Sequence, residues 1–223
     1  MNSKRRYMRM LALGLAAVLV CSSLTGCLKR KKTAYQTYMI NLLDVNYKGD
    51  FTGYVKDNNG DEETAAGVYE DSIGYLADQL ITHYSLDNSD SNAARDAFVD
   101  AAKVIYKGSK YEVSRAYKGG NGYCVDVTVY PMNILNQAYD DIYEYTDEYN
   151  KKIASGEFNN TEKEEYERQF AEGVADILKS KAENMDYLSP VVVTVKIVDG
   201  DGYYSVDPAD LKKVDATMLA VEN

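Results

Sequence analysis

Residues 111–129 read YEVSRAYKGGNGYCVDVTV, and this stretch decides the fold because the hydrophobic period changes here from 3.6 to 2. Apolar residues occupy positions 111, 113 and 117, then positions 123, 125, 127 and 129 beyond a glycine-rich turn. Such alternation predicts two half-buried β-strands joined as a hairpin. Both sets are odd-numbered, so the register requires a loop of odd length. A three-residue loop over 120–122, with Gly122 in the left-handed region, meets this requirement.

A second hairpin follows further along the chain. Val193, Val195 and Ile197 are odd-numbered, whereas Tyr204 and Val206 are even-numbered. This change of parity predicts a two-residue loop, for which Gly200-Asp201 has the glycine in the first position, as a type II′ turn requires.

Helical periodicity precedes, separates and follows the two hairpins. Three helices are expected before the first hairpin: one from about residue 35 to Gly49, one over 68–84, and one from about Ser91 to Gly108. A polar loop over 48–61 separates the first helix from the second. Between the hairpins, residues 132–188 predict a helical hairpin that Gly156 interrupts and whose second helix begins with a Thr161–Glu164 capping box. A short helix over 208–218 ends the pattern.

These elements predict an α+β fold. Two hairpins with one apolar face each bury that face best by forming a four-stranded antiparallel sheet packed against helices. Residues 132–188 are then a helical-hairpin insertion between the sheet's two halves. The alternative is a helical bundle with two peripheral hairpins.

The amino terminus has the features of a signal peptide. Residues 1–9 are basic, and residues 10–20 form an 11-residue uncharged run that is too short to span a membrane as a helix. The following Leu24-Thr25-Gly26-Cys27 resembles the lipobox of bacterial lipoproteins. The resemblance implies cleavage between Gly26 and Cys27 and a diacylglyceryl group on the Cys27 thiol. The expected divisions are therefore a signal peptide over 1–26, a lipidated and basic tether over 27–33, and a single ectodomain over 34–223.

A membrane anchor at Cys27 fits the residues around it. Two acyl chains hold a protein stably at a bilayer, and a basic run adds attraction to an anionic surface. That run is Lys29, Arg30, Lys31 and Lys32, which could also act only as a solubilising tether. We therefore expect a lipid-anchored protein on the extracytoplasmic face of the cell membrane, at a Gram-positive surface. The layout over roughly 33–220 resembles small lipoproteins of Gram-positive anaerobes, some with cystatin-like or NTF2-like folds, although the insertion departs from a plain NTF2-like cone.

Charge and residue counts exclude several classes of function. Residues 1–26 hold four basic and no acidic residues, so the remaining chain has 21 basic and 35 acidic residues and a net charge of −14. Such a polyanion does not bind nucleic acid. The single histidine, His83, excludes multi-histidine metal sites, and no nucleophile motif accompanies it. The acidic turns at 57–61 and 199–202 lack the glycine and closing glutamate of a calcium loop. We expect neither metal nor cofactor.

Two residues are candidate contacts with a ligand or partner. Parity places Arg115 on the apolar face of the first hairpin, where it would line an anion pocket or, alternatively, reach water at the sheet margin. The buried stripe of the helix after Pro131 is expected to include Tyr139 and Ile153. Tyr143 lies off this stripe and is expected to face solvent among acidic residues. Tyrosine is abundant, with 21 residues against 4 phenylalanines, and is typical of both core edges and binding surfaces.

Two classes of function remain. The first is a non-enzymatic binding module of the cell envelope, with a protein or glycan partner and a contact surface on the insertion. The second is an envelope hydrolase that uses a carboxylate pair which the sequence does not identify.

Overall fold

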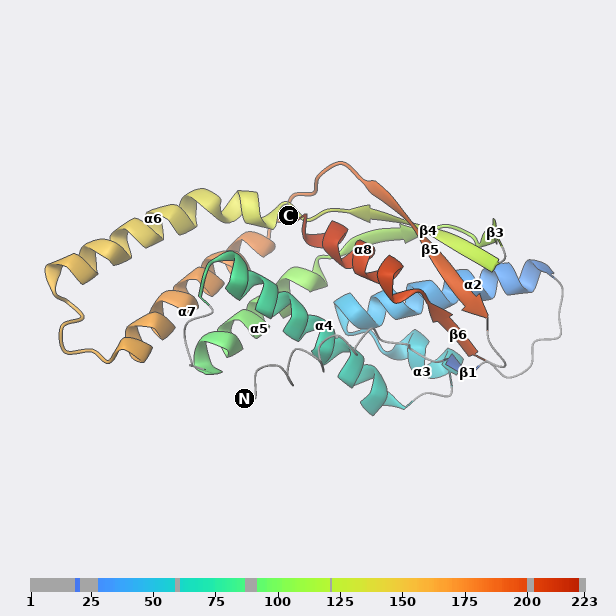
Figure 1. The fold of residues 1–223 in the computed structure, drawn as a ribbon, viewed down its shortest axis with the longest axis horizontal. Coiled ribbons are helices and arrows are strands. Elements are labelled where there is room, and N and C mark those ends of the chain that lie inside the picture. The colour runs from blue at the N-terminus through green and yellow to red at the C-terminus, as the bar shows by residue number, and fades with distance from the viewer. Residues whose placement is uncertain are drawn as a thin grey trace.

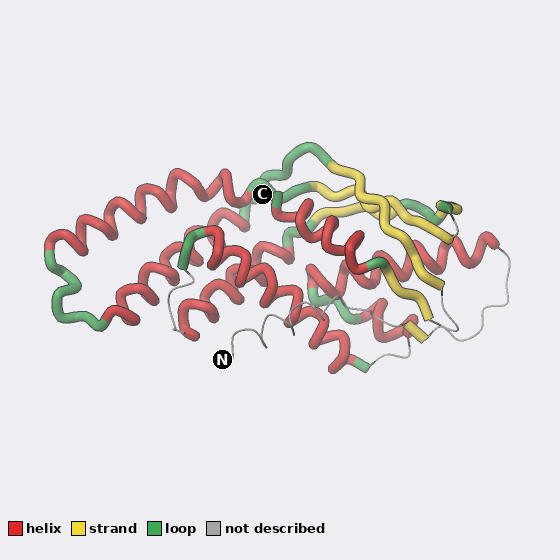
Figure 2. The backbone as a smooth tube through the Cα atoms, in the orientation of Figure 1, coloured by secondary structure: helices red, strands yellow, loops and turns green. Residues whose placement is uncertain are grey.

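The computed structural model describes residues 19–20, 28–58, 61–86, 92–120, 122–199 and 203–220. Gly26 and Cys27 lie outside these residues, so the cleavage and lipidation sites stay predictions. Helices cover one face of an antiparallel sheet, and two long helices extend away from it (Figures 1 and 2). The α+β class predicted from the sequence is confirmed.

The first half of the chain is helical. It contains α2 (Leu28–Leu43), α3 (Thr52–Asn58), α4 (Glu62–His83) and α5 (Asn92–Lys107). A π-helical turn, η1 (Asp44–Lys48), continues α2 and ends at Gly49, whose φ of 63° is left-handed as its place after a helix requires. The polar stretch after Gly49, expected as a loop, contains α3. The basic residues 29–32 belong to the first turns of α2. The expected division into signal peptide, tether and ectodomain stays a prediction.

The sheet joins the two predicted hairpins through its central strands. Its strands are β2 (Lys110–Val113), β3 (Tyr117–Gly119), β4 (Gly122–Tyr130), β5 (Val191–Asp199) and β6 (Tyr203–Val206). The order is β6-β5-β4-β2, with β3 also beside β4, and every pair is antiparallel. A two-residue strand β1 (Leu19–Val20), which lies within the expected signal peptide, pairs with β6.

The first hairpin contains an irregularity that parity did not reveal. Val113 opposes Val127 as expected, but Tyr117 opposes Cys124, so residues 115 and 116 together face one residue of β4. This is a β-bulge. The Ser114 hydroxyl accepts the backbone N–H of Asp126 at 2.8 Å, which takes the place of a regular ladder bond. The predicted three-residue loop was wrong: Gly119 pairs with Gly122, and Gly120, with a φ of 57°, adopts the left-handed conformation instead.

The bulge corrects the predicted positions of two side chains. Ala116 is buried, whereas Arg115 is exposed rather than on the apolar face. Tyr117 also moves to the outer face, where its hydroxyl donates to Asp126 Oδ1 at 2.7 Å. The extra residue shifts every later side chain of the strand to the opposite face.

The second hairpin keeps the predicted parity but has a different register. Ile197 opposes Val206 and Asp199 opposes Tyr204, so four residues, 200–203, separate the last pair described between β5 and β6. The predicted Gly200-Asp201 loop would have paired Asp199 with Gly202, so this predicted register was wrong. Residues 200–202 lie outside the described part of the chain.

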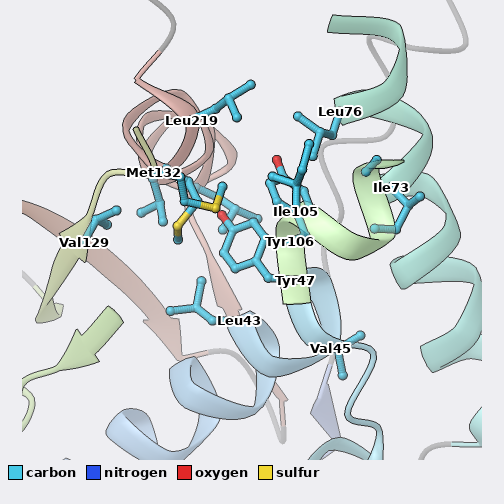
Figure 3. Close-up of a cluster of buried hydrophobic side chains, with 14 of the residues drawn as sticks. Leu43, Val45, Tyr47, Ile73, Leu76, Ile105, Tyr106, Val129, Met132 and Leu219 are labelled. Carbon is cyan, nitrogen blue, oxygen red and sulfur yellow. The ribbon is translucent and has the colours of Figure 1, made fainter. Parts of the chain in front are cut away.

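One face of the sheet forms the floor of the core. Five valines are buried there, and α2 and α8 (Pro208–Leu219) pack over them. They are Val125, Val127 and Val129 of β4 and Val193 and Val195 of β5. The Asp207 side chain caps α8 by accepting the N–H of Ala209. Tyr47 and Tyr106 meet edge to face at 4.9 Å in the middle of the helical layers (Figure 3). Leu43, Ile105, Met132 and Leu219 lie around this pair.

Candidate functional site

The insertion is a helical hairpin at one end of the molecule. It consists of α6 (Ile134–Ser155) and α7 (Lys163–Ala182), joined through Gly156, which has a φ of 84°. Its base is fixed to the sheet by a bridge between Met132 and Tyr187 and by the N–H of Leu188 donating to the Pro131 carbonyl. The connection between α6 and α7 and the start of α2 lie at opposite ends of the long axis (Figure 1).

Five aromatic side chains hold the two helices of the hairpin together. The Tyr145 and Phe170 rings stack at 5.5 Å, and those of Tyr149 and Phe158 stack at 5.0 Å. The fifth ring, Tyr166, contacts Phe158. Such pairs stabilise a contact by about 0.5–1.5 kcal/mol each beyond their buried area. The i,i+4 spacings 145/149 and 166/170 could have indicated this cluster from sequence, because residues four apart share a helix face.

Hydrogen bonds and one glycine complete this packing. The Tyr149 hydroxyl donates to the Tyr166 carbonyl at 2.5 Å, and burial raises the pKa of Tyr149 to about 12. It therefore stays neutral and keeps donating at physiological pH. Gly173 lies directly beneath the Tyr145 ring, and a methyl group on its Cα would overlap that ring. This close approach accounts for a glycine in the interior of α7, where it costs helix stability.

A groove of about 190 Å³ opens where α6 and α7 meet the end of α4. Its apolar wall comes from Tyr149, Ile153, Tyr166, Phe170 and Leu86, and its polar rim from Ser85, Thr146, Asn150 and Glu167. Ser85 has a φ of 55°. Its N–H donates to the Thr82 carbonyl and that of Leu86 to the Ile81 carbonyl, the pattern of a helix-ending Schellman motif. Sequence reasoning did not find this groove.

The outer face of α6 carries two exposed tyrosines. Tyr143 is 69% exposed, as expected, and stacks on Tyr139 with 6.5 Å between ring centroids. Tyr139 was expected in the buried stripe, and this was wrong, because it is 66% exposed. Ile153 was also expected to be buried and is 45% exposed, at the groove. Both differences arise because, among the described residues, α6 packs mainly against α7, so only a narrow stripe of it is covered.

The second helix also begins differently from the prediction. Glu162 precedes α7 as its N-cap and makes no side-chain capping bond, so the predicted Thr161–Glu164 capping box was wrong. Glu164 and Glu165 still lie in the first turn, where carboxylates interact favourably with the helix dipole.

The hairpin is strongly acidic. Residues 132–188 contain 14 acidic and 6 basic residues, a net charge of −8. Ion pairs at the surface neutralise part of this charge, such as that of Lys151 with Asp147 and that of the half-buried Lys181 with Asp141 at 2.6 Å. Exposed pairs of this kind add little stability.

The structure does not bring the two candidate contact residues together. Arg115 lies in the bulge between β2 and β3, whereas Tyr143 lies on α6, at the other end of the molecule (Figure 1). Their roles as contacts stay predictions. Of the two, only Tyr143 lies on the hairpin that contains the groove.

Outside the hairpin, the titratable groups His83 and Asp215 contact tyrosines of the fold. His83 is exposed in the last turn of α4, with its ring 4.8 Å from that of Tyr84. Burial raises the pKa of Asp215 to about 6, and the hydrogen bond from Tyr47 opposes that shift. In the described ranges, no group of three or more His, Cys, Asp or Glu side chains is placed to hold a metal ion. The described Cys124 is a half-buried free thiol.

The described residues thus define an α+β domain with an acidic helical hairpin, held together by aromatic side chains, and a groove lined by aromatic residues. No family model and no curated protein sequence matches the chain. Among solved structures, the chain is similar to that of ycdA, a candidate lipoprotein from Bacillus subtilis subsp. subtilis str. 168. The TM-score is 0.58 at 17% sequence identity, over 84% of this chain and 56% of that protein. The likeness concerns the fold and shows neither a cystatin-like nor an NTF2-like fold.

Within the described residues, no helix combines the length and apolar character that crossing a bilayer requires.

Proposed function

We propose that this chain is a lipid-anchored binding protein of the bacterial cell envelope that holds its partner on the α6–α7 hairpin. The observation that carries the proposal is that the expected anchor and the hairpin lie at opposite ends of the molecule. α2 begins at Leu28, immediately after the expected lipidated Cys27, and the hairpin extends from the other end of the long axis (Figure 1). A protein anchored through Cys27 would therefore present the hairpin away from the membrane.

The basic residues of α2 support an anchor at this end. Lys29, Arg30, Lys31 and Lys32 occupy the first turns of the helix, and its first turn contains no acidic residue. Cations are unfavourable at the positive end of a helix dipole. An anionic lipid surface would offset this repulsion and attract each cation by up to about 1 kcal/mol.

The form of the hairpin supports a binding role. It combines an open groove with exposed tyrosines, and such an arrangement binds partners without any catalytic group. The fold shared with a candidate lipoprotein agrees with the same function. An envelope hydrolase would in addition need a carboxylate pair facing a substrate. Among the described residues, the carboxyl group with the most strongly raised pKa is that of Asp215, which instead accepts a hydrogen bond from the core residue Tyr47.

Site-specific photocrosslinking in intact cells tests the proposal. A photoreactive phenylalanine at position 143 is compared with the same group at position 75, because Tyr75 is also exposed but lies on α4. We expect a partner to be captured from position 143 and not from position 75. Capture from both positions alike, or from position 75 alone, would refute a binding surface on the hairpin.

A further inference from the structure

Part of β5 has backbone groups that point away from its neighbour β4. In β4, the Asp126 carbonyl accepts the N–H of Ser114 at 2.8 Å and the Asp126 N–H donates to the Ser114 hydroxyl, so both groups face the first hairpin. Thr194 of β5 lies opposite Asp126, and its own N–H and C=O therefore point away from β4. Because this direction alternates along a strand, the backbone groups of Val192 and Lys196 point the same way.

This edge of β5 is covered at one end and stops at a proline at the other. β6 pairs with β5 only over residues 197–199. At Lys196, the N–H donates to Asp210 Oδ2 and the carbonyl accepts the N–H of Asp207. Pro190, just before the strand, has no N–H to offer. The stretch over 191–195 lies between these two ends.

Within this stretch, Val192 and Thr194 leave their edge groups open. In the part of the chain that the structure describes, no hydrogen bond reaches their N–H or C=O from the edge side. Two donors and two acceptors thus face outward, with about 6.8 Å between the equivalent atoms of the two residues. An extended polypeptide backbone matches this alternation, whereas a glycan or a lipid does not.

The side chains around the open edge are apolar and uncharged. Residues 187–195 include no charged residue. Val192 is 60% exposed, and Leu188 and Val191 are 40% and 43% exposed. Edge strands of soluble proteins are normally protected by a charge, a proline or a covering segment. Here the charge of Lys196 and Pro190 stand at the two ends of the stretch and not within it.

The neighbouring part of the same sheet edge shows which kind of chain pairs here. β1 (Leu19–Val20) lies antiparallel along β6, with Leu19 opposite Tyr204. β1 belongs to the uncharged run over 10–20 that is expected to leave with the signal peptide. An extended, uncharged segment therefore occupies the β6 part of this edge.

We propose that the open edge of β5, residues 191–195, binds an extended, uncharged aliphatic segment of a partner protein by strand addition. Main-chain hydrogen bonds at Val192 and Thr194 would hold the segment, and the exposed valines would select aliphatic side chains. This surface is separate from the α6–α7 groove, so the inference goes beyond the proposed function.

A second copy of the chain does not fit this edge, and this one point rests on the proposed anchor. β5 runs toward the end of the molecule at which α2 begins (Figure 1). Antiparallel pairing of two β5 strands would reverse one molecule and place the two α2 starts, with their anchors, at opposite ends. Two molecules anchored in one membrane cannot pair in this way.

Binding of a defined peptide to the purified mature protein in non-ionic detergent tests the inference. The probe is a fluorescent seven-residue peptide of alternating Val and Thr with blocked ends. One counterpart has N-methyl groups on two adjacent central residues, so that neither of its edges can pair. A second counterpart has Lys in place of each Val. We expect the probe to bind at least tenfold more tightly than either counterpart.

Three variants locate the binding. Val192→Pro removes an edge N–H that takes no part in the pairing with β4, and Val192→Lys places a charge beside the open edge. Val198→Lys is the matched control, because Val198 lies on the same face of β5 and is 44% exposed but is paired with β6. We expect both changes at position 192 to weaken probe binding at least fivefold and Val198→Lys less than twofold. Circular dichroism checks that each variant is folded.

Equal binding of the N-methylated counterpart would overturn the inference, because strand addition requires the backbone groups. Probe binding that neither change at position 192 weakens, or that Val198→Lys weakens equally, would also overturn it. A dimer in light scattering that Val192→Lys dissociates would identify a second copy as the occupant and overturn the choice of partner. Crosslinking from position 143 tests the proposed function separately, since that residue lies on α6.

Discussion

Tyr47 donates a hydrogen bond to Asp215 and so joins the π-helical turn after α2 to the last helix, 168 residues further along the chain. The tyrosine ring is fully buried against Tyr106, and Asp215 is the described carboxyl group with the most strongly raised pKa. A parallel bond from Tyr111 to Asp44, 2.6 Å long, ties η1 to β2. Together these bonds fix the turn between the sheet and α8.

The buried carboxyl group makes stability depend on pH. Burial raises the pKa of Asp215 from 3.8 to about 6, so the folded state binds its proton more tightly than the unfolded state. This group therefore contributes most stability below about pH 4, and the contribution is lost as the pH rises to about 6. Asp215→Asn removes this titration. We expect the urea midpoint of the variant, relative to wild type, to rise between pH 4 and 6 and then to stay constant.

A second variant serves as the control for this pH profile. Tyr47→Phe keeps the ring and removes the donor that stabilises the carboxylate, so it should lower stability most above pH 6, by about 1–3 kcal/mol. If wild type and Asp215→Asn differ by the same amount at every pH from 4 to 8, Asp215 does not titrate as stated.

Gly173→Ala should destabilise the protein, although alanine normally favours a helix. The new methyl group would displace the Tyr145 ring and disturb the contact between α6 and α7, at a cost of about 1–3 kcal/mol. Gly67→Ala is the matched control, because it lies in α4 with no atom near its missing Cβ, and should stabilise by about 1 kcal/mol. Thermal unfolding of both variants measures these opposite effects, and stabilisation by Gly173→Ala would contradict the close packing.

Ser85→Gly should stabilise the end of α4. The left-handed conformation at Ser85 is unfavourable for residues with a Cβ, and relief of this strain is partly offset by the greater freedom of glycine in the unfolded chain. We expect a net gain of about 0.5–1 kcal/mol in urea denaturation. Ser72→Gly, inside α4, should lose a similar amount. A loss in both variants would argue against strain at Ser85.

Cys27→Ala should abolish the membrane anchor. The variant should not incorporate radiolabelled fatty acid, and it should either be released or stay unprocessed, because the thiol that receives the lipid is gone. Fractionation and intact mass of both proteins measure this. The expected wild-type mass corresponds to a chain that begins at a diacylglyceryl-modified Cys27, and an unmodified Cys27 or another first residue would refute the prediction. Cys124→Ala, which changes the other cysteine of the mature chain, should leave the anchor intact.

Local patterns predicted the elements because each depends on neighbours in sequence. The periods of α4, α5, β4 and β5 follow from apolar spacing, and Gly49 and Gly156 end their helices in the left-handed conformation that glycine favours. The pairing of both hairpins into one antiparallel sheet followed from the need to bury two apolar faces. The length of the helical-hairpin insertion, 132–188, followed from the hydrophobic periodicity.

Tertiary structure alone decided the details that depend on partners distant in sequence. The bulge at Arg115 depends on the hydrogen bond between Ser114 and Asp126 across the hairpin. The alternation of apolar residues in the sequence does not indicate this bulge. The exposure of Tyr139 and Ile153 depends on how much of α6 the neighbouring elements cover. A periodic stripe shows which positions are apolar, but it does not show how many of them a neighbouring element will bury. The groove exists only where Ser85 and Leu86 meet side chains of α6 and α7 that lie 60 residues or more further along the chain. The sequence by itself therefore determined the elements and their pairing, whereas the packing of distant segments determined the candidate binding surface.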